Sequence, residues 1–239
     1  METLARQGVY HTSMDMDMDM DSDTPELFDL YDDAGRPLGQ TKPRDAVHRD
    51  GDWHRSAHVW IFTPDRRLLF QRRAPDKDTW PGRLDASVGG HYHAGEGTDG
   101  VLREAQEELG LALEPGELIP IGERRVESRE PGIDDREVQD VYLLRRDLPL
   151  AAYRPDLGEI DALVLLDAAD AAWLHAEVVE SELDEVPSAK AESLAVGGGA
   201  TYPIAVTPRD LIPGRGAYLT AIARAVADVL AGRPPRRLT

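Results

Sequence analysis

A triply acidic helix behind a glycine-rich turn is the feature that most constrains this chain. Residues 89–97 contain four glycines, and residues 99–109 have helical periodicity. At about 100° per residue, Glu104, Glu107 and Glu108 fall within roughly 100° of arc. The other side of the helix is apolar and consists of Val101, Leu102, Ala105 and Leu109. The sequence therefore predicts a helix that packs on a core through one face and presents three carboxylates on the other.

Three carboxylates this close together repel one another unless a cation neutralises them. A hard divalent cation with oxygen ligands removes that cost, so Mg²⁺ is expected, with Mn²⁺ as an alternative. Gly110 is expected to end the helix. The simpler alternative is a solvated charged face. Such faces normally intersperse lysines at helical spacing, and this helix has none.

The segment resembles the Nudix box, G-x5-E-x7-R-E-U-x-E-E-x-G-U, in which U is an apolar residue. The positions that match are Gly90, Glu96, Arg103, Glu104, Ala105, Glu107, Glu108, Gly110 and Leu111. One departure precedes the helix, because six residues separate Glu96 from Arg103 where the family has seven. This shortfall puts the family's pairing of Glu96 with Arg103 in doubt, but it leaves the spacing of the three acids intact.

The Nudix resemblance implies a magnesium-dependent hydrolase that cleaves a diphosphate linkage in a small molecule, such as a nucleoside diphosphate derivative. Water would attack a phosphorus atom and a phosphate ester would leave. The implied metal ligands are Glu104, Glu107, Glu108 and the carbonyl group of Gly90. The expected catalytic residues are Glu104, Glu108, Arg103 and Glu137, with Glu127 and Glu130 as alternative bases to Glu137.

The segments that flank the box carry a second resemblance. Residues 54–62, 69–73, 80–82 and 87–91 are similar to type I isopentenyl diphosphate isomerases and their hydrolase-like relatives. In the isomerases, metal is bound at positions matching His48, His54, His91 and a position close to Asp135, and an acid matching Glu137 takes part in proton transfer.

Two departures from the isomerases favour hydrolysis over isomerisation. The isomerases use a cysteine as the partner acid or base, and that position is Gly89 here. Glycine can neither donate nor accept the proton that isomerisation requires. The isomerases also have a degraded Nudix helix, whereas the helix is intact in this chain. Isomerisation of isopentenyl diphosphate stays the first alternative. A sensor that binds a nucleotide-like ligand without catalysis is the second, although such proteins usually lose the box carboxylates.

The remaining polar candidates are interpreted one by one. His91 lies in the glycine-rich turn and is expected to bind substrate, as are Arg72 and Arg73 at the end of a strand, one of which is expected to face solvent. His54 is interpreted as a residue that orients a loop, and His48 as part of a polar stretch. A second metal site built from these three histidines is an alternative that the sequence does not favour. His58, His93 and His175 are interpreted as structural or surface residues.

Charge and composition exclude several classes of protein. A net charge of -18 repels phosphate backbones, so nucleic acid is not an expected partner. Without cysteine the chain has no disulfide, thiolate zinc site or cysteine nucleophile. It shows neither an apolar run long enough to span a membrane nor a secretory signal, so a cytoplasmic location is expected. A homodimer is possible.

Strand and helix patterns alternate along the chain. We expect strands near residues 28–31, 38–41, 58–63, 68–72, 84–88, 119–126, 138–144 and 160–166, and helices near 99–109, 168–177 and 217–231. This interleaving favours a mixed sheet covered by helices, and the resemblance implies an α/β/α sandwich of the Nudix type. Residues 1–24 are expected to be a disordered acidic arm. Residues 25–239 are expected to form one domain, with an acidic and glycine-rich excursion near 178–200.

Overall fold

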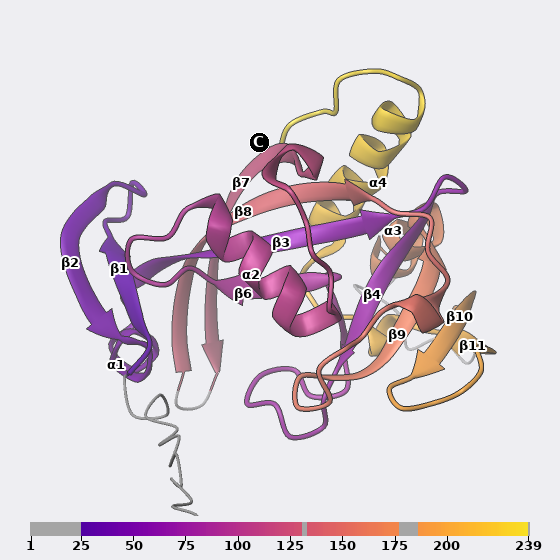
Figure 1. Cartoon of the computed structure of the whole chain (residues 1–239), viewed down its shortest axis with the longest axis horizontal. Coiled ribbons are helices and arrows are strands. Elements are labelled where there is room, and N and C mark those ends of the chain that lie inside the picture. Colours follow the sequence, from indigo (N-terminus) through magenta and orange to yellow (C-terminus); the bar gives the residue numbers. More distant parts are fainter. Residues whose placement is uncertain (1–24, 131–132, 177–185, 239) are drawn as a thin grey trace, which may run out of the picture.

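The computed structural model describes residues 25–130, 133–176 and 186–238 (Figure 1). Its strands are β1 (Leu27–Tyr31), β2 (Pro37–Pro43), β3 (Trp53–Phe62), β4 (Arg67–Arg73), β5 (Leu84–Asp85), β6 (Val88–His91), β7 (Ile119–Glu130), β8 (Ile133–Arg145), β9 (Ile160–Asp167), β10 (Ala189–Ala195) and β11 (Tyr202–Val206). Its helices are α1 (Arg44–Asp50), α2 (Thr98–Leu109), α3 (Ala168–Ala176) and α4 (Gly216–Leu230). The expected arm at residues 1–24 lies outside the described residues.

A single mixed sheet organises the described part of the chain. Along its main path the strands follow the order β11-β10-β9-β4-β3-β1-β2. β8 pairs with β3 in parallel, and β6 pairs with β3 in the antiparallel sense. β7 and β8 form a long antiparallel hairpin. β3 is therefore flanked by β6 and β8, two strands that carry candidate site residues.

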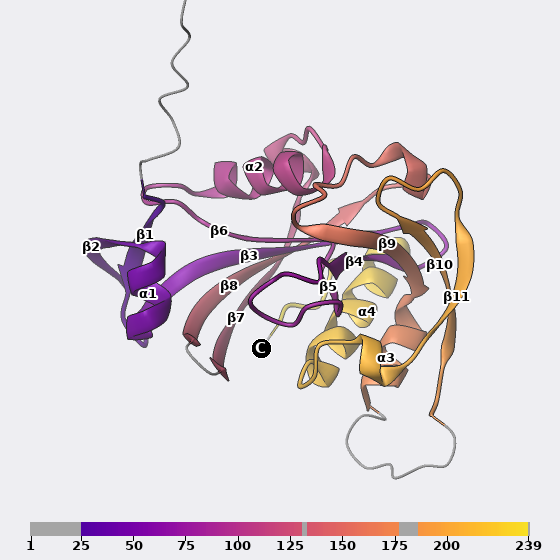
Figure 2. The same cartoon turned by 90° about the horizontal axis from the view of Figure 1, so that it is seen from below.

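Helices cover both faces of the sheet, as Figure 2 shows with α2 on one side and α3 and α4 on the other. The alternation of side chains along β3 explains how one strand serves both layers. Trp60 and Phe62 pack in the cluster that contains residues of α3 and α4, whereas Val59 and Ile61 pack in the cluster that contains residues of α2. The predicted α/β/α sandwich with a mixed sheet is confirmed.

Three sequence-based expectations need correction. α1 was not predicted, and β3 begins at Trp53, well before the expected start at residue 58. The expected excursion at 178–200 is only partly described, and within it β10 pairs with β9 and β11 instead of forming a loop. Residues 128–130 and 133–136 belong to the β7–β8 hairpin. None of the helices in the described part of the chain has the length and apolar character needed to cross a membrane.

Candidate active site

Two glycines of β6 allow close approach of the acids on α2. A Cβ atom at Gly90 would lie 2.1 Å from the carboxyl carbon of Glu104, so any side chain at this position would displace that carboxylate. The backbone N–H of Gly89 donates a 3.0 Å hydrogen bond to Glu108. Glu107 is the outer acid, with 57% of its side chain exposed. The glycine-rich turn and the acidic helix predicted from the sequence therefore meet at one place.

Arg103 ties the acids of α2 to the turn that precedes the helix. Its guanidinium pairs with Glu96 and Glu104 at 3.0 Å and with Glu107 at 2.9 Å. It also donates a 3.0 Å hydrogen bond to the backbone carbonyl of His91. The doubt about the Glu96–Arg103 pair was wrong, because Glu96 lies just before α2 and the shorter connection still leaves it within reach.

The burial of two of these acids fits a bound cation. Burial raises the pKa of Glu108 well above its usual value, and it also raises the pKa of Glu104 although Arg103 opposes that shift. Both shifts favour the neutral acid, and a divalent cation would reverse them. In the described part of the chain the oxygens of the three acids do not gather within 4.8 Å of one another, but three carboxylates supply the all-oxygen donors that Mg²⁺ prefers. The residues present therefore fit a divalent metal.

Three histidines from separate elements converge in the same region. The ring centroids of His48 on α1, His54 on β3 and His91 on β6 lie 5.0 to 5.3 Å apart. One ligand atom of each lies within 4.8 Å of the others. Burial lowers the pKa of His48 to about 3 and that of His54 to about 4, so both rings are neutral at physiological pH. Neutral imidazole is a good ligand for transition metals.

His54 was interpreted as a residue that orients a loop, and its Nδ1 atom does lie 3.0 Å from the backbone carbonyl oxygen of Asp52. Its side chain is fully buried, and its Nε2 atom has no hydrogen-bond partner among the described residues. That atom lies 3.5 Å from Asp135 Oδ1. This carboxylate oxygen is likewise buried and has no hydrogen-bond partner in the described part of the chain. His54, Asp135 and Glu137 form a second group with metal-ligating geometry. The resemblance to the isomerases had pointed to these positions, and the parallel pairing of β3 with β8 brings them together.

Glu137 is the buried acid at the centre of this region. It accepts a 2.7 Å hydrogen bond from Ser56, faces His91 Nε2 at 3.3 Å and accepts a hydrogen bond from the Gln139 side chain. Burial opposes its ionisation, yet the contact with His91 lowers its pKa well below the usual value. The neighbouring Asp135 shows the opposite behaviour, because burial and the charge of Glu137 raise its pKa to about 8. Glu137 is thus the ionised member of the pair.

The structure also distinguishes Glu137 from Glu127 and Glu130, the two alternative candidates for the catalytic base. Glu137 lies inside β8, because this strand begins at Ile133 and not near residue 138 as expected. Glu127 is exposed at the cavity rim and lies 3.7 Å from Arg136. The side chain of Glu130 lies outside the described residues. Among the acids whose side chains are described, Glu137 combines burial with contact to His91.

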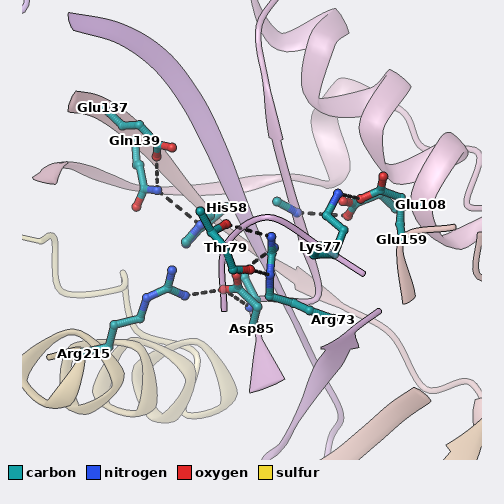
Figure 3. Close-up of polar contacts among 12 residues, drawn as sticks. His58, Arg73, Lys77, Thr79, Asp85, Glu108, Glu137, Gln139, Glu159 and Arg215 are labelled. Atoms are coloured by element: carbon teal, nitrogen blue, oxygen red, sulfur yellow. Dashed lines mark hydrogen bonds and ion pairs between the residues drawn. The ribbon is translucent and has the colours of Figure 1, made fainter. Parts of the chain in front are cut away.

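Arginines form another part of the same region (Figure 3). Asp85 is flanked by Arg73, at 3.5 Å, and by Arg215, which donates a short hydrogen bond to it. Burial would raise the pKa of Asp85, but Arg215 and Arg73 hold it below its usual range. Arg73 also donates to the carbonyl of Thr79 at 2.8 Å. Arg73 lines the cavity and Arg72 does not.

A cavity of about 830 Å³ joins these groups. It is lined by the acids of α2, by His48 and His91, by Glu137, and by the arginines around Asp85. Pockets that bind small molecules usually have volumes of roughly 300 to 1,000 Å³. Figure 3 shows Glu108 on one side of Asp85 and Arg215 on the other, so acidic and basic walls face a common space.

A family model described as NUDIX domain matches residues 52–188, which is more than half of the chain. The chain belongs to the Nudix hydrolase family. An uncharacterised Nudix hydrolase of Clostridium acetobutylicum is 31% identical over 209 residues, covering 85% of this chain and 98% of that protein. Nudix hydrolase 3 of Arabidopsis thaliana is 39% identical over 144 residues, covering 58% of this chain but only 19% of the plant protein. An isopentenyl-diphosphate Delta-isomerase of Paenarthrobacter aurescens is 34% identical over 167 residues, covering 69% of this chain and 84% of the isomerase.

Several cavity residues of this Nudix protein were missed in the sequence. Gln139 alternates with Asp135 and Glu137 along β8, so strand periodicity would have placed it on the same face as these two positions, which the sequence had already pointed to. Arg124 lies opposite Gln139 in the β7–β8 register. No local sequence pattern marks Arg215 as a cavity residue. It follows the segment that matches the NUDIX domain, and only the position of α4 brings it to the cavity.

Proposed function

We propose that this Nudix protein hydrolyses a diphosphate linkage in a small molecule, with Mg²⁺ as the metal and a nucleoside diphosphate derivative as the substrate class. The supporting observation is that the acids of α2 and the arginines around Asp85 line one cavity. Cleavage of a diphosphate requires neutralisation of the charge on the phosphoryl oxygens and orientation of both phosphates. Acids that hold a cation and arginines in the same cavity meet both requirements.

The metal would be held by Glu104, Glu107, Glu108 and the carbonyl of Gly90, and when bound it would neutralise negative charge on the phosphoryl oxygens. Arg103 keeps these carboxylates oriented through its ion pairs. Arg73 and His91 bind phosphoryl oxygens, because both line the cavity beside the acids.

Glu137 is the proposed general base. It takes a proton from the attacking water, whose oxygen forms a bond to phosphorus while the bond from that phosphorus to the bridging oxygen breaks. The leaving phosphate ester keeps the electron pair of the broken bond. The contacts with His91 and Ser56 keep Glu137 ionised and fix its orientation.

The test is a panel of nucleoside diphosphate derivatives, dinucleotides and isopentenyl diphosphate, assayed with Mg²⁺ for phosphate-containing products. We expect hydrolysis of at least one member, and loss of it on the order of 10²- to 10³-fold in Glu108→Gln. Asp99→Asn, an exposed acid-to-amide change on the same helix, serves as the matched control. Equal activity of Glu108→Gln and wild type would refute the metal assignment.

Isomerisation of isopentenyl diphosphate is the second candidate. The cluster of His48, His54 and His91 beside Glu137 supports it, because these positions match the metal ligands and acid of the isomerases. Gly89 argues against it, since the position of the partner thiol has no side chain. Its Cβ would meet His58 at an ordinary distance of 3.5 Å, so Gly89→Cys is sterically possible. Formation of the isomer by wild type without release of phosphate would favour this candidate.

A further inference from the structure

Arg124 on β7 is a cavity residue that none of the roles above uses. It lines the cavity, and its Nε donates a 2.7 Å hydrogen bond to Gln139. Its guanidinium carbon lies 3.8 Å above the centre of the Tyr218 ring, which is a close cation–π contact. No ion pair joins it to a carboxylate among the residues that the structure describes. Its two terminal amino groups are therefore not engaged by a described acid.

The Tyr218 ring that supports Arg124 is held rigidly by α4. Its hydroxyl accepts a 2.8 Å hydrogen bond from the Trp60 indole and lies 3.1 Å from His58 Nδ1. On the other side of the imidazole, the Gln139 amide faces His58 Nε2 at 3.4 Å. An N–H group on Gln139 makes Nε2 the acceptor, so the ring proton sits on Nδ1 and points to Tyr218. Arg124, Tyr218 and Gln139 are thus fixed by one buried network.

The same network connects Arg124 with the proposed base. Gln139 receives the hydrogen bond of Arg124 on its oxygen and donates from its nitrogen to Glu137, a chain that Figure 3 shows from Glu137 through Gln139 to His58. Arg124 is consequently linked to Glu137 through a single intervening side chain, Gln139. This places the free amino groups of Arg124 close to the proposed reacting atoms.

We propose that Arg124, held flat against Tyr218, binds a phosphoryl group of the substrate through its two terminal amino groups. The inference rests on the proposed function, because it names a binding residue for that substrate. It also assigns a role to α4, which lies beyond the segment that matches the NUDIX domain. In this protein the segment after the domain match completes the substrate site.

The charges around Arg124 indicate that the group its amino groups bind is an anion. Burial lowers the pKa of Arg124, and the positive charge of Arg215 lowers it further. Arg73 and Arg215 share a single carboxylate, Asp85, so this wall has excess positive charge. The planar fork of an arginine matches two oxygens of a phosphoryl group, and a stacked arginine loses little freedom on binding. A phosphoryl anion would satisfy Arg124 and reduce the repulsion between it and Arg215.

The test measures binding, so that it does not depend on turnover. Methylenediphosphonate, a diphosphate analogue that cannot be hydrolysed, is titrated calorimetrically into the full chain with saturating Mg²⁺. We expect Arg124→Gln to weaken its affinity on the order of 10- to 100-fold. Arg124→Lys keeps the charge but loses the fork, so it should recover only part of the affinity. Arg224→Gln, an exposed charge removal on α4, is the matched control and should bind as wild type does.

Two variants of Tyr218 separate support of Arg124 from general damage to α4. Tyr218→Phe keeps the ring beneath the guanidinium and should keep the affinity, although it lowers the melting temperature by leaving Trp60 and His58 without their acceptor. Tyr218→Leu removes the ring and should weaken binding as Arg124→Gln does.

The outcomes separate this inference from the proposed function. Unchanged affinity of Arg124→Gln, or no binding by wild type, overturns the role of Arg124. Hydrolysis by wild type together with unchanged affinity of Arg124→Gln overturns the inference alone and leaves the hydrolase intact. Binding that depends on Arg124 without hydrolysis of any diphosphate supports the inference and refutes hydrolysis.

Discussion

The three acids of α2 differ in burial, and this difference decides what each can contribute. Glu107 is largely exposed, whereas Glu108 is buried and Glu104 rests against the backbone of Gly90. Exposed acids cost little when ionised, but buried acids need a partner. The spacing of the acids could be predicted from the sequence. Their burial could not, because it depends on β6 passing alongside α2.

Gly90 offers a direct test of the close approach between β6 and α2. In Gly90→Ala the added Cβ would lie 2.1 Å from the Glu104 carboxyl carbon, so the carboxylate must move. Displacing a metal-binding group by about 1 Å can reduce turnover on the order of 10²-fold. We expect that reduction together with a higher half-saturating Mg²⁺ concentration, measured by activity titration. Gly89→Ala, whose Cβ has its nearest neighbour at 3.5 Å, should lose far less activity. Similar losses in both variants would contradict the steric explanation.

The raised pKa of Asp135 predicts how stability depends on pH in the absence of metal. Burial and the charge of Glu137 raise it from 3.8 to about 8, so the folded state keeps a proton that the unfolded state has lost. This contribution to stability is present at low pH and disappears as pH rises through about 8. Four histidines with lowered pKa values, His48, His54, His58 and His175, add an opposing rise in stability that is nearly complete about one pH unit above their ordinary value of 6.5.

Urea denaturation in EDTA between about pH 7.5 and pH 8.5 measures this effect of Asp135, because the contribution of the histidines is nearly complete at the start of that window. We expect the free energy of unfolding to fall with pH, by at most about 1.4 kcal/mol per pH unit for this group. Asp135→Asn should flatten the curve, leaving the smaller part that comes from buried Glu108. A wild-type curve that rises with pH over this window would show that the pKa of Asp135 is not raised.

At the level of elements, a helix with a strong local sequence signal was predicted, whereas a strand that depends on tertiary pairing was missed. α2 was predicted almost to the residue because an apolar face and Gly110 define it, and Gly110 indeed adopts a left-handed φ of 66°. β10, with the sequence AKAESLA, was missed because alanine, lysine and glutamate favour helices. Its pairing with β9 and β11 overrides that preference. α1 has only seven residues and lacks a side-chain cap, so the sequence carried little signal for it.

α4, the helix that carries Tyr218, is also expected to stabilise the fold by packing on the sheet. Ile222 is fully buried in the cluster that joins α3 and α4 to the sheet. Ile222→Ala removes methylene groups and leaves a cavity, so it should lower the free energy of unfolding by about 2 to 4 kcal/mol. Arg224→Gln on the exposed side should change it by less than about 0.5 kcal/mol. Chemical denaturation monitored by tryptophan fluorescence measures both, and equal stability of the two variants would show that α4 does not pack as described.

The whole molecule combines a strongly negative charge with a site proposed to bind a negatively charged substrate. The net charge is -18, and carboxylates outnumber arginine and lysine side chains among the residues that line the cavity. The Debye length falls from about 30 Å at 0.01 M salt to about 8 Å at 0.15 M. At low salt the substrate therefore meets repulsion from acids far outside the site, whereas the arginines around Asp85 act only at short range. Positive charge near Asp85 is therefore supplied by a few arginines, Arg73 and Arg215 among them, within a cavity that is acidic as a whole.

Salt should consequently accelerate capture of the substrate. At saturating free Mg²⁺, raising NaCl from about 0.01 M to 0.15 M should increase kcat/KM on the order of 2- to 10-fold, because screening removes long-range repulsion. The value of kcat should stay nearly constant, since the bound substrate is already surrounded by the charges of the cavity. A neutral viscogen at matched viscosity controls for diffusion. A decrease of kcat/KM with salt would mean that the arginine wall and the bound cations already dominate the field at the cavity entrance, and that the acidic surface contributes little to the encounter.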